Sequence, residues 1–104
     1  MQKIIKETEE LAFAYLKAFG FEEDEILPVV MKGRHDLETT LEKLQEALGR
    51  DNVSDQELDD ILHSLKGLLF HMGNNDLAQQ VDEIRHDTDR EALEQKLKVL
   101  FFNG

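Results

Sequence analysis

A histidine, a lysine and a glycine lie close together near the middle of the chain, at His63, Lys66 and Gly67. If this stretch is helical, residues three and four positions apart share one face, so the three form a single patch. An imidazole has an ordinary pKa of about 6.5 and is a good nucleophile near neutral pH. The lysine places a positive charge one helical turn away. These residue types at this spacing indicate a chemical site.

The segment that carries these residues is predicted to be one amphipathic helix. The three site residues and Phe70 fall on one side and are expected to face solvent. A glycine inside a helix costs about 1 kcal/mol relative to alanine, and the buried stripe gives no reason for Gly67. The apolar side chains of the opposite side recur every three or four positions, as in a helix with one buried face: Leu58, Ile61, Leu62, Leu65, Leu68, Leu69 and Met72.

The N-terminal third of the chain has a less regular pattern. A first helix is predicted over residues 2–19, with a glycine after it as a stop signal. Residues 21–28 are interpreted as a short acidic connection, in which Pro28 can open a new turn. Residues 32–34 contain a glycine and are expected to form a break. The next helix is therefore predicted to begin at 35 or 36 and to end at 48.

Three capping residues mark the starts of the later helices. Ser54 is a good N-cap for the central helix, either Asn74 or Asn75 can cap the following one, and Thr88 is expected to cap the last. The connections are short, and short connections make neighbouring helices antiparallel. We therefore expect an all-α fold, with an antiparallel up-down four-helix bundle over residues 35–102 and an N-terminal helical extension over residues 1–34.

The composition limits the classes of function. A chain of 104 residues with 40% hydrophobic residues is expected to form one folded domain. The net charge of −11 argues against binding to nucleic acid or to an anionic membrane surface. The absence of cysteine excludes disulfides and thiolate metal sites, and it fits a cytoplasmic location. No apolar run approaches the roughly 20 residues that span a bilayer.

The site resembles the signature of histidine-containing phosphotransfer (HPt) domains. That signature is a histidine, then a lysine and a glycine three and four residues later, then a second glycine six residues beyond the first. His63, Lys66, Gly67 and Gly73 match these four positions. The resemblance covers residues 36–101. It implies a bundle of antiparallel helices with the histidine exposed in the middle of a helix, which agrees with the helix pattern.

The resemblance implies that His63 Nε2 accepts a phosphoryl group from a phosphoaspartate or a kinase and passes it on. Lys66 would neutralise phosphoryl oxygens, and Gly67 would leave room for the phosphoryl group or the partner. Gly73 is expected to end the helix and permit a tight turn. The implied partners are a response-regulator receiver domain or a hybrid sensor histidine kinase. The chain would be a monomeric phosphoryl carrier, not an enzyme, and would need no cofactor, because Mg²⁺ is expected on the receiver.

The sequence departs from the family pattern at three positions. Phe70 and His71 stand where the family commonly has small or polar residues. Phe70 can either pack against a neighbouring helix or form part of a docking surface. Arg85 occupies the place where several family members carry a glutamine that orients the histidine ring. Because arginine can only donate hydrogen bonds, it can contact the phosphoryl group but cannot accept from the ring.

Other titratable residues have simpler interpretations. His71 is eight residues from His63, too far for joint metal ligation, and is interpreted as a surface or helix-packing residue. The histidines at positions 35 and 86 lie near predicted helix ends and are expected to be solvated. Asp59 and Asp60 precede His63 by about one turn, and they are interpreted as a solvated acidic face rather than as groups that tune its pKa.

Two alternatives to a free phosphotransfer protein remain open. The first is a helical docking module for a receiver that keeps the fold but carries no phosphate, for which the residues at 70, 71 and 85 are the reason. The second is the phosphoacceptor domain of a larger chemotaxis-type kinase. No kinase segment or linker is evident in the sequence, so the second alternative requires the chain to be a fragment.

Overall fold

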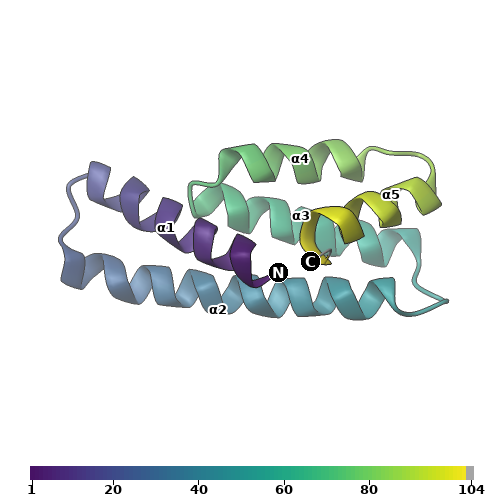
Figure 1. Cartoon of the computed structure of the whole chain (residues 1–104), viewed down its shortest axis with the longest axis horizontal. Coiled ribbons are helices and arrows are strands. Elements are labelled where there is room, and N and C mark those ends of the chain that lie inside the picture. Colours follow the sequence, from purple (N-terminus) through teal and green to yellow (C-terminus); the bar gives the residue numbers. More distant parts are fainter. Residues whose placement is uncertain (103–104) are drawn as a thin grey trace.

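Five α-helices and a π-helical turn make up residues 1–102, the part of the chain that the computed structural model describes (Figure 1). No strand occurs within these residues, so the all-α prediction with an additional N-terminal helix is confirmed. No helix in this part of the chain is long and apolar enough to cross a membrane. The helices are α1 (Gln2–Ala18), α2 (Glu23–Leu48), α3 (Asp55–His71), α4 (Asn75–Arg85) and α5 (Arg90–Leu97), and the π-helical turn spans Lys98–Phe102.

Leucine stripes on α2 and α3 form the centre of the core. Leu41 and Leu44 on α2, like Leu65 and Leu69 on α3, are completely removed from solvent. Burying one such side chain stabilises the fold by about 1.5–3 kcal/mol. The helices α2, α3 and α4 run alternately up and down beside one another (Figure 1), and α5 closes the core with Leu97. The predicted stripe of the central helix is confirmed.

Helix α2 is continuous, so the break predicted at residues 32–34 is wrong. Two ion pairs at a spacing of four residues support the helix there: Lys32 Nζ lies 3.2 Å from an Asp36 oxygen, and Arg34 Nε lies 2.9 Å from a Glu38 oxygen. Gly33 faces the core, and a Cβ atom at this position would stand 3.0 Å from the Met72 side chain. The glycine therefore permits close packing and does not end the helix. The predicted boundary between residues 34 and 35 falls inside α2.

The start of α2 lies well before Pro28, in the stretch interpreted as a connection. Glu22 precedes the helix, and its backbone N–H donates to Glu25 Oε1 at 3.1 Å. Three acidic residues occupy the first turn, where the helix dipole favours negative charge. Pro28 loses one backbone hydrogen bond, and the helix tolerates it near the N-terminal end.

Helix α1 packs on the N-terminal half of α2 and reaches the turn between α3 and α4 (Figure 1). Asn74 Nδ2 donates to Thr8 Oγ1 at 2.9 Å, and both residues are buried. Gly73 has a φ of +80°, and a Cβ atom there would stand 3.0 Å from Tyr15 Cβ. The glycine therefore ends α3, as predicted, and also makes room for α1.

Two of the predicted caps are confirmed and one is wrong. Ser54 Oγ accepts from Glu57 N–H at 3.0 Å at the start of α3, and Asn74 caps α4. At the start of α5 the cap is Asp89, whose side chain accepts from the Glu91 N–H at 3.1 Å. Thr88 lies one residue earlier and is exposed. Aspartate is among the preferred capping residues, so the shift by one residue exchanges one good cap for another.

Candidate functional site

His63 is exposed near the middle of α3, on the side that faces away from the core. Lys66 and Gly67 follow it on the same face at the predicted spacing. A Cβ atom at Gly67 would meet no atom within 4 Å beyond its chain neighbours and the backbone of its own helix, so the backbone there is open to a partner molecule. Phe70 completes this face one turn later and is 59% exposed, which excludes the interpretation that it packs against a neighbouring helix.

Two ion pairs between α3 and α4 flank the histidine. Asp59 on α3 holds Arg85 on α4 through two hydrogen bonds, of 2.7 Å to Nε and 3.3 Å to Nη2. Lys66 on α3 donates to Asp82 on α4 at 3.0 Å. Each helix therefore contributes one acid and one base, and His63 lies between the two pairs. Asp59 is partly exposed, as interpreted, but it is also bound to Arg85 and is therefore more than a solvated charge.

Arg85 also reaches the histidine ring. Its Nη1 atom lies 3.2 Å from His63 Nδ1, and the predicted place of Arg85 beside the ring is confirmed by this distance. Since the guanidinium only donates, Nδ1 accepts this hydrogen bond. The three residues Asp59, Arg85 and His63 thus form one connected group on two helices.

The family model of the Hpt domain matches residues 33–100. This stretch includes the whole of the site described above and well over half of the chain. The chain belongs to the Hpt domain family. Hpt domains are histidine phosphotransfer modules of two-component signalling, and the family implies receiver or kinase partners. No curated protein and no solved structure gave a significant match to the chain.

The electrostatics of this Hpt domain follow from the two ion pairs. The hydrogen bond from Arg85 lowers the pKa of Asp59, and the nearby charge of Arg85 lowers it further. The hydrogen bond from Lys66 lowers the pKa of Asp82 in the same way. The hydrogen bond to Asp59 raises the pKa of Arg85. Lys66 and Arg85 are therefore each already partnered by a carboxylate before any phosphoryl group arrives.

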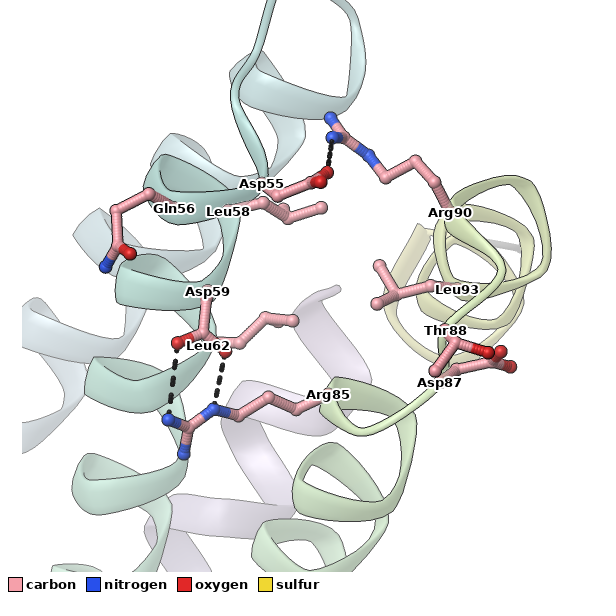
Figure 2. A pocket seen from close by; sticks show the side chains of 10 residues that line it. All are labelled: Asp55, Gln56, Leu58, Asp59, Leu62, Arg85, Asp87, Thr88, Arg90 and Leu93. Carbon is pink, nitrogen blue, oxygen red and sulfur yellow. Dashed lines mark hydrogen bonds and ion pairs between the residues drawn. The ribbon is translucent and has the colours of Figure 1, made fainter.

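A cavity of about 430 Å³ borders the Asp59–Arg85 pair (Figure 2). Figure 2 shows the two hydrogen bonds of this pair on one side and Arg90 reaching Asp55 on the other. Leu58, Leu62 and Leu93 supply apolar lining. The Arg85 side chain therefore has open space next to it on the side of α5.

The other histidines are exposed, and of these only His86 touches a residue of the site. His71 and His35 are solvent-exposed, in agreement with their interpretation as surface residues. The His86 ring donates from Nδ1 to the Asp82 backbone oxygen at 2.7 Å and lies beyond the end of α4. Residues 1–102 contain no group of three or more potential metal ligands that could hold an ion.

Two acidic residues of the site were missed as functional candidates. Asp59 precedes His63 by four residues and Asp82 precedes Arg85 by three, so each lies on the site face of its helix. That spacing was a usable signal. The partner of each, however, lies on the other helix, 26 and 16 residues away in the sequence, and only the antiparallel packing of α3 and α4 brings them together.

Proposed function

We propose that this Hpt domain carries a phosphoryl group on His63 Nε2 and exchanges it with the aspartate of a receiver domain in a cytoplasmic phosphorelay. The observation that supports this most is the exposed His63 ring on one open face with Lys66 and Gly67. An exposed ring can enter a partner's active site, whereas a buried one cannot. We expect the domain to act as a monomer.

In the transfer, one bond to phosphorus forms as another breaks. The lone pair of Nε2 forms an N–P bond while the P–O bond of the phosphoaspartate breaks, and the aspartate carboxylate leaves with the electron pair. The ring then carries a proton on Nδ1, which it releases to give phosphohistidine with a neutral imidazole ring. The reverse reaction returns the phosphoryl group to a carboxylate. The domain is a carrier, and the partner supplies the catalytic site with its Mg²⁺.

Lys66 and Gly67 have different parts in this proposal. The Lys66 ammonium lies one turn from His63 and can turn from Asp82 to the phosphoryl oxygens, which carry a higher charge than one carboxylate. The open backbone at Gly67 leaves clearance for the receiver surface. Neither residue belongs to the core, so their effects on transfer can be separated from effects on folding.

The test is phosphotransfer from radiolabelled phosphorylated receiver domains of the same genome. We expect one or a few receivers to label the wild-type chain within seconds to minutes, and acetyl phosphate alone to label it poorly. The label should be labile to acid and stable to alkali, as phosphohistidine is. His63→Gln should abolish labelling, while His71→Gln, a change at another exposed histidine of α3, should not. Full labelling of His63→Gln would overturn the proposal.

Phe70 is proposed to be part of the receiver-docking surface. It is a large apolar side chain on the His63 face, and exposed aromatic residues often contribute strongly to binding. Phe70→Ala should weaken receiver binding about ten-fold or more, as a side chain with a 1.4 kcal/mol contribution would. Its folding stability should not change. Equal affinity of the variant and the wild type would exclude this role.

A second candidate function is a docking module that binds a receiver without carrying phosphate, and the exposed Phe70 is the observation that favours it. In that case a receiver should bind the wild type and His63→Ala equally well. Neither protein would accept phosphoryl groups from any receiver of the genome. Transfer to the wild type alone would reject this candidate.

A further inference from the structure

The guanidinium of Arg85 is shared between a carboxylate and the histidine ring. Its Nε and Nη2 atoms face the two oxygens of Asp59, and Nη1 lies 3.2 Å from His63 Nδ1. Figure 2 shows the two-pronged contact with Asp59 and the third nitrogen directed away from that carboxylate. The bidentate contact fixes the plane of the guanidinium, so Asp59 determines where the third nitrogen points.

This contact determines where the neutral ring holds its proton. A neutral imidazole has one N–H and one lone pair in the ring plane. Because Arg85 remains charged and can only donate, Nδ1 must offer its lone pair, and the proton therefore resides on Nε2. In this form the exposed Nε2 atom is an N–H group with no lone pair to attack phosphorus. The only available lone pair is the one that Arg85 covers.

We infer that Asp59 and Arg85 form a latch on His63 Nδ1, which holds the unphosphorylated ring in the tautomer that cannot react at Nε2. The inference rests on the proposed phosphotransfer function and identifies Asp59, through Arg85, as a positioning residue of that site. The ring becomes nucleophilic at Nε2 only after Arg85 leaves Nδ1 and the proton moves there. Arg85 thus has a role that a glutamine, which can accept from an Nδ1–H group, does not have.

The same latch fits the phosphorylated ring. After the N–P bond has formed and the Nδ1 proton has gone to solvent, Nδ1 again has a lone pair that Arg85 can cover. When water attacks the phosphoryl group, a new P–O bond forms, the N–P bond breaks and its electron pair returns to Nε2, a step that is easier when Nδ1 takes up a proton. A guanidinium on Nδ1 keeps that proton away. The latch therefore slows loss of the phosphoryl group until a partner displaces Arg85.

The surroundings permit Arg85 to move. Its side chain is about a quarter exposed, and the 430 Å³ cavity beside the Asp59 pair gives it space. A phosphoryl group on the docked receiver has more charge than Asp59 and competes with it for the guanidinium. Asp82 Oδ1 stands 3.9 Å from Nη1 and offers a second resting place on α4. Opening the latch therefore gives Arg85 another charged partner, and the Asp59 carboxylate, whose side chain is 43% exposed, is left to solvent.

The direct test is the tautomer of His63, measured by ¹⁵N NMR of the free, unphosphorylated protein at about pH 8.5, where an ordinary histidine is neutral. In the wild type the two ring nitrogens should give widely separated shifts, with Nδ1 at the position of an unprotonated nitrogen. In Arg85→Met the two tautomers should exchange and the shifts should move toward each other. Asp59→Asn should give an intermediate change, since its amide holds the guanidinium less firmly.

Arg50→Met is the matched control. Arg50 makes a similar ion pair with Glu57 at 2.6 Å near the start of α3, away from His63. The charged groups that face the ring, which are Asp59 and Lys66 on α3 and Asp82 and Arg85 on α4, are unchanged in this variant. Its His63 shifts should equal those of the wild type. Identical ring shifts in the wild type and Arg85→Met would overturn the latch.

A second measurement separates the latch from the proposed function. The lifetime of phosphohistidine, followed after removal of the receiver, should be several-fold shorter in Arg85→Met than in the wild type or Arg50→Met. If phosphorylation occurs but neither the tautomer nor the lifetime changes, the latch is wrong and the proposed function survives. If no receiver phosphorylates His63, the proposed function fails, and the NMR result still decides whether Arg85 fixes the tautomer.

Discussion

The His63 face and the hairpin of α1 with the start of α2 present opposite kinds of surface. Around His63 the exposed side chains are mostly polar and paired across two helices, and the apolar stripe beneath them is buried. In residues 1–102, nine large apolar side chains are exposed, and seven of them lie between Leu11 and Met31. The stretch that matches the Hpt family begins at residue 33. The family fold thus carries the site, and the N-terminal segment adds a surface of different chemistry.

The largest expected difference between the core and the surface of the α1–α2 hairpin is in how much a truncated side chain lowers the free energy of unfolding. Leu65→Ala empties a fully buried position on α3 and should lower the free energy of unfolding by about 3–5 kcal/mol. Met31→Ala removes a side chain that is 67% exposed and should change it by less than about 0.5 kcal/mol. Urea unfolding followed by circular dichroism measures both. Similar losses for the two variants would show that the hairpin surface is covered in solution.

A smaller loss of stability is expected for a change at Asn74, which joins α1 to the turn between α3 and α4. Asn74 both caps α4 and donates to the buried Thr8 hydroxyl. Asn74→Ala should therefore cost about 2–3 kcal/mol, the sum of a lost cap and an unpaired buried hydroxyl. Asn75→Ala, a change at the exposed neighbour, is the control in the same unfolding experiment. If Asn74→Ala is as stable as the control, α1 is not held by this contact.

At the site, stability and function should change in opposite directions. Gly67→Ala places a methyl group in open space on a helix and should stabilise the free domain by up to about 1 kcal/mol. The same methyl group should slow phosphotransfer from the receiver, because it projects from the docking face. Unfolding and transfer rates measured on one preparation test both statements. Unchanged transfer in a stabilised Gly67→Ala variant would remove the clearance role.

The smallest expected effect is the contribution of the Asp59 and Asp82 ion pairs to the pH dependence of folding stability. The hydrogen bonds from Arg85 and Lys66 lower the pKa of Asp59 and Asp82 in the folded state. A lowered pKa stabilises the fold above the ordinary aspartate pKa of about 3.9, and the contribution disappears as pH falls through the lowered value. The double variant Asp59→Asn, Asp82→Asn should therefore lose less stability than the wild type between about pH 5 and pH 2. Parallel pH profiles would show that these pairs do not form in solution.

The sequence was sufficient for α3 because its apolar residues form a single stripe. The start of α2 has no such stripe: Ile26 and Val30 are buried, while Leu27, Val29 and Met31 between and beside them are exposed. An apolar run without a clear period does not define a helix face, and the proline and glycine nearby then read as breaks. The packing of α1 and Met72 against this region shows which of its apolar residues are buried and why Gly33 does not break the helix.

The sequence predicts those parts of the site that depend on spacing within one helix, but not those that depend on contacts between helices. His63, Lys66 and Gly67 are placed on one face by local helix geometry, which sequence spacing determines. The contact of Arg85 with Asp59 depends on the register between α3 and α4, because the two residues are 26 positions apart. Register follows from the length of the turn at Gly73 and the packing beneath it. The spacing in the sequence therefore identifies the nucleophile. The groups that control its proton can be recognised only once the folded structure is known.

The most direct test of phosphotransfer through His63 is the position of the phosphoryl group on the chain. After phosphorylation by its receiver, the domain should give one phosphohistidine signal by ³¹P NMR, and ¹⁵N correlation should assign the bond to Nε2 of His63. The signal should be absent from His63→Gln and unchanged in His71→Gln and His86→Gln. A phosphoryl group on any other residue of the wild type, or a signal that persists in His63→Gln, would show that His63 is not the phosphoacceptor.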